Sequence, residues 1–172
     1  MTAWSLPVRL ADIARGPVTL DLLPDVDARA AVARVLDLEG LLTLTGQIEV
    51  RPWLDGAELL GRFQATALRI CGVTLEPFDE SVTGEIEVRL VPAGSPHAAG
   101  ESGGELALDI DAPDPPDEME GDVIDVAAYV VEHLALELDP FPRKPGAEFD
   151  YKPEGGEVSP FAALAKLKGP DS

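Results

Sequence analysis

Apolar and polar residues alternate along much of the first half of the chain, a period that is typical of β-strands with one buried face. From residue 42 to 50 and again from 82 to 90, aliphatic side chains hold the even positions and polar side chains hold the odd positions, with one glycine interrupting each stretch. Each stretch therefore predicts a strand that packs one face on the core and turns the other face to solvent.

A third strand is predicted between these two. The segment Phe63–Ile70 changes the parity of its apolar residues near Ala67, which predicts a β-bulge there. Asp55-Gly56 supplies a turn before this strand, and Pro77, which has no N–H to donate, supplies a turn after it. Because the connections are short, antiparallel pairing is favoured, and residues 41–91 predict a three-stranded meander.

Three segments show helical rather than alternating spacing. Residues 25–37 begin with Asp25, a residue type that caps helix N-termini, and residues 123–138 follow Asp122, which we expect to cap the principal helix. Residues 160–168 predict a short helix near the C-terminal end of the sequence.

Together these patterns predict an α+β fold, in which two main helices pack against a curved antiparallel sheet of about five or six strands. Shorter apolar runs supply the remaining strands, at Leu6–Ile13, Val18–Leu22 and Leu106–Ile110. Whether the sheet closes into a partial barrel is left open. We expect one domain over residues 1–145, with a mobile loop at 93–104, an acidic loop at 111–121 and a flexible tail at 146–172.

The charge of the chain is strongly acidic and unevenly distributed. The formal net charge is -19, and the interval between Arg89 and Arg143 holds 13 acidic residues without a single Lys or Arg. Such a surface repels a phosphate backbone and attracts basic partners, at a rate that falls as salt screens the charges. The alternative is that these carboxylates are only a solvated surface that keeps the protein soluble.

The sequence contains few residues that are typical of catalytic or metal sites. It has no glycine-rich phosphate loop, HExxH or GxSxG motif, and its two histidines and one cysteine are far apart. Cys71 and His133 could pair as nucleophile and base, but Cys71 follows an apolar strand, where core packing is the better interpretation. We therefore expect no catalytic residue, no metal and no cofactor.

No charged leader followed by an apolar run begins at Met1, and no apolar run is long enough to span a membrane. A single cysteine cannot form a disulfide within the chain. We expect a cytoplasmic protein, a monomer, that makes no contact with membranes.

Three short motifs follow one another along the chain. Cys71–Pro77 reads CGVTLEP and precedes the second alternating strand, Asp122–Pro145 contains Glu132 and ends in DPFPRKP, and Ser159–Lys168 reads SPFAALAKLK. In this order they resemble the YceD family of large ribosomal RNA subunit accumulation proteins, in a variant with a single cysteine.

The resemblance implies a bacterial cytosolic protein that is needed for accumulation of the large-subunit (23S) ribosomal RNA, and it does not imply a reaction. Many members carry a CxxC pair at this hairpin, which suggests a metal site in those proteins. Here Cys71 is the only cysteine, so the resemblance does not imply a metal for this chain. The matching positions are candidates for structural or interaction roles, and they are Cys71, Leu75, Glu76, Pro77, Glu132 and Pro145.

The favoured hypothesis is a non-catalytic ribosome biogenesis factor that binds a basic ribosomal protein or a pre-50S particle through an acidic docking segment. This segment comprises Glu101, Glu105, Asp109, Asp111, Asp114, Asp117, Glu118 and Glu120. The polar turn at Glu76-Pro77 is a second place where we expect a contact.

The alternative is an RNA-binding module that acts directly on precursor ribosomal RNA. The residues that would contact RNA from the sheet are Arg51, Arg62, Arg69 and Arg89. We expect such binding to be weak, because the chain lacks the clustered Lys and Arg that neutralise phosphates. A small enzyme that depends on Cys71 and His133 is the least favoured hypothesis.

Overall fold

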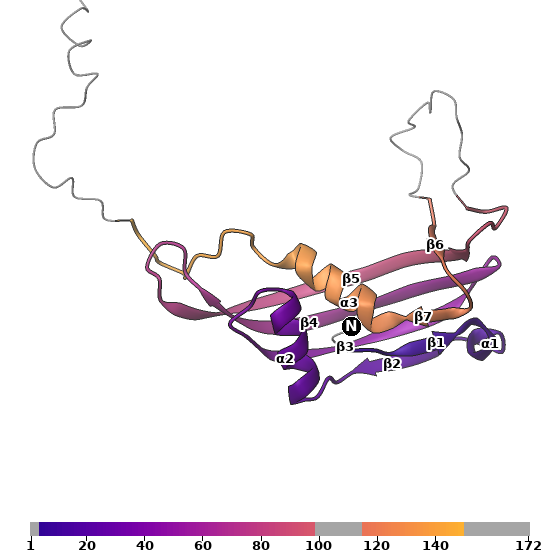
Figure 1. Cartoon of the computed structure of the whole chain (residues 1–172), viewed down its shortest axis with the longest axis horizontal. Helices are drawn as coiled ribbons and strands as arrows, with labels where there is room; N and C mark the ends of the chain where they lie inside the picture. Colours follow the sequence, from indigo (N-terminus) through magenta and orange to yellow (C-terminus); the bar gives the residue numbers. More distant parts are fainter. Residues whose placement is uncertain (1–3, 99–114, 150–172) are drawn as a thin grey trace, which may run out of the picture.

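The computed structural model describes residues 4–98 and 115–149, which form an α+β fold built on a long five-stranded sheet (Figure 1). The strands are β2 (Val18–Leu22), β3 (Gly40–Trp53), β4 (Gly56–Ile70), β5 (Pro77–Pro92) and β6 (Asp117–Met119), adjacent in that order. A second sheet pairs β1 (Pro7–Arg9) with β7 (Val123–Asp125). The helices are α1 (Leu10–Ile13), α2 (Val26–Val35) and α3 (Val126–Glu137).

The predicted three-stranded meander is confirmed, since β3, β4 and β5 pair antiparallel over nearly their whole lengths. The predicted bulge lies in the neighbouring strand instead of in β4. The pairing shifts between Leu41 and Thr43 of β3, opposite Ala67. β4 keeps its parity throughout, because Leu68 and Ile70 are not drawn into the core, and Ile70 remains 37% exposed.

The prediction of a purely antiparallel sheet is wrong at one edge. β6 pairs in parallel with the last three residues of β5, so that the sheet is mixed. β6 falls within the expected acidic loop at 111–121, and it forms there because Met119 enters the core, where it is 6% exposed. In the part of the chain that the structure describes, the edge strands β2 and β6 do not pair with one another, so the sheet is open and does not close into a barrel.

The helix predicted at 25–37 is confirmed as α2, and its cap is confirmed as well, since Asp25 accepts a 2.8 Å hydrogen bond from the N–H of Ala28. The principal helix, α3, begins later than expected. Residues 123–125 form β7, and Asp125 rather than Asp122 caps the helix by accepting the N–H of Ala127.

The single strand expected at Leu6–Ile13 is divided into β1 and α1. Pairing with β7 covers only three residues, and the chain then turns at Arg9, whose N–H donates to the side chain of Asp12. The N–H of Leu10 donates to the carbonyl of Asp122, which fixes this turn against the segment before β7.

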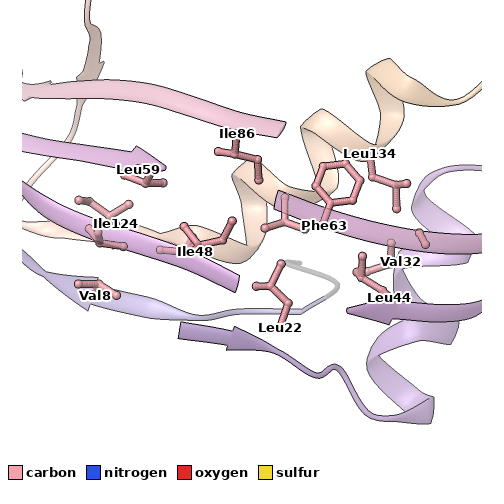
Figure 2. Close-up of a cluster of buried hydrophobic side chains, with 14 of the residues drawn as sticks. Val8, Leu22, Val32, Leu44, Ile48, Leu59, Phe63, Ile86, Ile124 and Leu134 are labelled. Carbon is pink, nitrogen blue, oxygen red and sulfur yellow. The ribbon is translucent and has the colours of Figure 1, made fainter. Parts of the chain in front are cut away.

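The core lies on one face of the five-stranded sheet, which we call the inner face (Figure 2). Val32 of α2, Leu134 of α3 and Ile124 of β7 pack in the same cluster as strand residues such as Ile48 and Phe63. Both long helices and the small sheet therefore cover this face. The opposite face, which we call the outer face, carries the odd positions of β3 from Thr43 onward, the odd positions of β5 and the even positions of β4. Most of its side chains are exposed or half-buried.

Several expected features lie outside the described residues. These are the strand at 106–110, the helix at 160–168, most of the tail at 146–172 and the second half of the loop at 93–104. Among the described helices, none is long and apolar enough to cross a membrane.

Candidate functional site

Three charged side chains form a row across the outer face where β3, β4 and β5 lie side by side. Arg51 and Arg89 are the direct neighbours of Glu58 on either side. Arg51 donates from Nε to one carboxylate oxygen at 2.7 Å, and Arg89 donates from Nε to the other at 2.9 Å. Between these two guanidinium groups, Glu58 is only 3% exposed, although it lies on the face that carries no helix.

The pKa of Glu58 reflects a competition between burial and hydrogen bonding. Burial by itself raises the pKa of the carboxyl, but the hydrogen bonds and charges of Arg89 and Arg51 together outweigh it and hold the pKa below its ordinary value. Glu58 is therefore a charged link across three strands.

Trp53, at the end of β3, completes this row. The guanidinium carbon of Arg89 lies 5.6 Å from the centroid of the Trp53 ring, within the range of a cation–π contact. Arg89 also donates to Glu87 at 3.2 Å. Trp53 therefore packs against a charged side chain at the end of the sheet.

The four arginines predicted to contact RNA do not share one surface. Arg51, Arg62 and Arg89 lie on the outer face, whereas Arg69 lies on the inner face. Arg62 pairs with Glu85 at 2.9 Å in full contact with solvent. Arg69 pairs with Glu80 at 3.1 Å and donates to the carbonyl of Asp139, which attaches the end of α3 to the sheet. All four guanidinium groups therefore contact a carboxylate.

A shallow groove of about 700 Å³ crosses the outer face from β2 to β5. The side chains of Glu49, Glu85 and Glu87 line it, opposite Arg62 and the apolar Leu60. This groove carries more negative than positive charge, so its chemistry favours a cationic ligand over a phosphate.

Two of the sequence motifs meet at one end of the molecule, where the β4–β5 hairpin contacts the segment after α3 (Figure 1). The N–H of Gly72 donates to the carbonyl of Pro142 at 2.9 Å, and the N–H of Lys144 donates to the sulfur of Cys71 at 3.3 Å. Lys144 also pairs through Nζ with Glu76 at 2.9 Å. We call this contact the hairpin junction.

Cys71 is buried as expected, at 0% exposure, but it lies outside the apolar core cluster. Its sulfur accepts the backbone N–H groups of Val73, Thr74 and Lys144 at 3.3–3.4 Å. The side-chain hydroxyl of Thr74 also interacts with the sulfur and has the largest effect on its pKa, followed by the N–H of the same residue. Together these hydrogen bonds lower the pKa of the thiol to about 6. The sulfur therefore joins the hairpin loop to the segment after α3 as a hydrogen-bond acceptor.

None of the hydrogen bonds of Cys71 involves His133, whose Nδ1 bonds to the carbonyl of Tyr129 on α3 at 2.8 Å. The described residues also contain no group of three or more His, Cys, Asp or Glu side chains that could hold a metal ion.

Apolar side chains project into solvent at the hairpin junction. Leu75 has a left-handed backbone, with φ of 58°, and its side chain is 76% exposed. The exposed fraction of Phe141, on the facing segment, is also 76%. Glu76 and Pro77 follow Leu75 directly and are exposed, and Pro145 follows Lys144. The hairpin junction is therefore held by hydrogen bonds and exposes two large apolar side chains, Leu75 and Phe141, to solvent.

Glu132 lies elsewhere, in an acidic cleft of about 370 Å³ between β6, β7 and α3. Glu118, Glu120 and Asp125 also line this cleft, together with Tyr129. The pKa of Tyr129 is raised, first by burial and then by the negative charges of Asp117 and Glu132.

The acidic cleft includes part of the predicted docking segment. Glu118 and Glu120 line it, and Asp117 lies on β6 close enough to Tyr129 to raise its pKa. The other members lie outside the described residues, and they are Glu101, Glu105, Asp109, Asp111 and Asp114. Sequence reasoning missed Tyr129 and Glu58, because a tyrosine in an apolar helix and a glutamate beside a turn carry no distinctive signal.

A family model described as "Large ribosomal RNA subunit accumulation protein YceD" matches residues 59–168, a range that contains the hairpin junction, the acidic cleft and the SPFAALAKLK motif. No curated protein and no solved structure matches the chain.

Proposed function

This chain belongs to the YceD family of large ribosomal RNA subunit accumulation proteins, and on this premise we propose that it is a non-catalytic assembly factor that binds a basic ribosomal protein or a precursor particle of the large subunit. Membership implies a role in accumulation of the large-subunit ribosomal RNA. The proposal concerns how the chain fulfils that role.

The observation that carries this proposal is the acidic cleft. It combines carboxylates from three elements, Glu118 on β6, Asp125 at the end of β7 and Glu132 on α3, around the half-buried ring of Tyr129. A tyrosine ring beside carboxylates suits a Lys or Arg side chain, because the ring face and the carboxylates both attract a cation. Ribosomal RNA, in contrast, would meet a surface of its own sign.

The arginines point to the same conclusion. Each of the four that were expected to contact RNA already faces a carboxylate, as in the Arg51–Glu58 and Arg62–Glu85 pairs. A phosphate group would have to compete with that carboxylate, and neutralising phosphates is the main source of affinity for RNA.

A binding experiment tests the proposal. The purified chain is expected to bind a basic large-subunit ribosomal protein at low salt, and the affinity should fall steeply as salt is added. Replacing Glu118 and Glu132 by Gln should weaken binding, whereas Asp27→Asn on α2 serves as a matched control with no effect. Binding that is unchanged by the double substitution would remove the cleft as the site.

Direct RNA binding is a second candidate, favoured by one observation. Trp53 and Arg89 lie in contact on the open outer face, and a base could stack on an aromatic ring of this kind. Crosslinking to precursor ribosomal RNA should then be lost in Trp53→Ala and in the variant with Arg51, Arg62 and Arg89 replaced by Gln. Unchanged crosslinking in both variants would rule this candidate out.

A further inference from the structure

We propose that the open edge of β5 binds a basic, extended segment of a partner protein as an additional strand of the sheet. This inference rests on the proposed function, which calls for a basic protein partner, and it specifies where and in what conformation part of that partner binds. The site would lie at Ser81–Arg89, a surface that is distinct from the acidic cleft.

The first observation is that β5 lacks a strand partner along most of one edge. β5 has 16 residues, and β6 pairs only with Leu90, Val91 and Pro92 (Figure 1). Near the other end of β5, the N–H of Asp139 bonds to the side chain of Glu80, so the segment after α3 occupies that end. Among the described strands, none pairs with this edge from Ser81 to Arg89. An unpaired edge of this length is a template for another strand.

The second observation is that this edge lacks three features that commonly prevent pairing, which are proline, lysine and a bulge. Residues 81–89 contain no proline and no lysine, and Arg89 is their only cation. β4 and β5 pair without a break in register from Ala57–Leu90 to Ile70–Pro77, so no bulge turns the edge away. Natural sheets usually protect an exposed edge by one of these means.

The third observation identifies the occupant by its charge. Glu85 and Glu87 project from the outer face beside the open edge. Each contacts one arginine, Arg62 or Arg89, but their side chains remain 74% and 67% exposed to solvent. Glu137 of α3 lies beside Gly84, and Asp117 and Glu118 continue the negative charge along β6. A strand at this position therefore meets carboxylates along its length, and a basic segment is complementary to them.

The same charges disfavour two other occupants. A second copy of this chain would bring its own β5 carboxylates against the first set, and like charges directly opposite one another are destabilising. The chain's own alternating run at 105–111 is also unsuitable, because it carries Glu105, Asp109 and Asp111.

The side-chain pattern of the partner follows from the geometry of the sheet. Alternate residues of an added strand point to opposite faces. Those on the outer face would lie near Glu85 and Glu87, and those on the inner face would lie near the half-buried Val88. A segment that alternates Lys or Arg with aliphatic residues fits both faces.

The test uses the full chain and a short synthetic peptide that alternates lysine with valine. Hydrogen exchange at low salt should show that amides at every second residue between Ser81 and Arg89 become protected when the peptide binds, because every second N–H of an edge strand points outward. A matched peptide with N-methyl groups on alternate residues keeps the charge but loses the backbone donors, and it should bind about tenfold more weakly.

Charge variants complete the test. Replacing Glu85 and Glu87 by Gln should weaken binding of the peptide about fivefold, whereas replacing Glu39 by Gln, away from the edge, should not. Protection confined to the acidic cleft, or equal affinity for the two peptides, would overturn the edge site and leave the proposed function standing. If neither the peptide nor any basic ribosomal protein binds at low salt, both proposals are wrong.

Discussion

One carboxylate, that of Glu58, is buried on the face of the sheet that carries no helix. Glu58 is tolerated there because Arg51 and Arg89 donate to its two oxygens, and the three side chains connect neighbouring strands. An ion pair of this kind contributes little to stability compared with apolar packing, but removing one partner leaves a buried charge unsatisfied. The effect of a substitution should therefore depend on which residue of a pair is changed and how deeply it is buried.

We expect Glu58→Gln to lower the free energy of unfolding by about 2 kcal/mol, because two guanidinium groups lose their common anion. Urea denaturation measures this change. The matched control is Glu85→Gln, which removes the fully exposed partner of Arg62 and should change the free energy by less than about 0.5 kcal/mol. Equal losses in the two variants would mean that burial of Glu58 has no energetic consequence.

The same variant should show a dependence on pH. Since the pKa of Glu58 is lower in the folded state than its ordinary value of 4.5, its contribution to stability is present above that value and is lost as the pH falls through the folded pKa. The difference in unfolding free energy between the wild type and Glu58→Gln should therefore shrink as the pH falls below 4.5. A difference that stays constant would contradict the lowered pKa.

Cys71 should combine a low pKa with slow alkylation. We expect the ultraviolet absorbance of its thiolate to titrate with a midpoint near pH 6, while iodoacetamide reacts slowly until the protein unfolds, because the sulfur is fully buried. A folded pKa below the ordinary 9.0 also means that the stability of the wild type relative to Cys71→Ala rises between pH 6 and 9. Rapid alkylation of the folded protein would support the enzyme hypothesis instead.

At the scale of elements, glycines determine how the long strands pack. Gly46 on β3 and Gly84 on β5 are the direct neighbours of Phe63, and its ring lies over Gly84 on the inner face. A Cβ atom at Gly46 would lie 2.3 Å from the carbonyl oxygen of Arg62, a backbone atom that cannot move independently. The close approach of β3 and β4 at this point therefore requires a residue without a side chain.

We expect Gly46→Ala to lower the free energy of unfolding by about 3 kcal/mol, because the strands must separate to admit the methyl group. Gly40→Ala, in the same strand, is the matched control. Its Cβ would lie 3.7 Å from the Cβ of Leu68, an ordinary contact, so the change should be within about 0.5 kcal/mol. Thermal or urea denaturation of both variants gives the comparison, and similar losses would contradict the packing described here.

For the whole molecule, the net charge of -19 opposes the compact state, whereas six ion pairs among the described residues favour it. Three of these pairs, Arg62–Glu85, Arg89–Glu87 and Lys144–Glu76, have an exposed carboxylate and are worth little. We therefore expect that about 0.3 M sodium chloride raises the melting temperature by about 3 °C at neutral pH, since it screens the repulsion more than the pairs. Near pH 4.2, where the net charge vanishes, the effect should disappear. A melting temperature that falls with salt at neutral pH would mean that the pairs dominate.

The meander, the helix α2 with its Asp25 cap and the acidic charge follow from the amino-acid sequence alone, because alternation and capping are local properties and net charge is set by composition. The sequence also carried the family resemblance, through short motifs that each lie within one segment of the chain. The positions of individual strands and helices in the first ninety residues follow largely from these patterns.

Which residues come together depends on contacts between segments that are distant in the sequence. β6 and β7 are three residues long, and each forms because a distant strand pairs with it, so no local pattern could predict them. Likewise, contact between distant segments placed Arg69 on the inner face, brought Lys144 to Cys71 and buried Glu58 between two arginines. Short strand pairings and buried charges depend on partners far along the chain, so local sequence patterns cannot predict where they form.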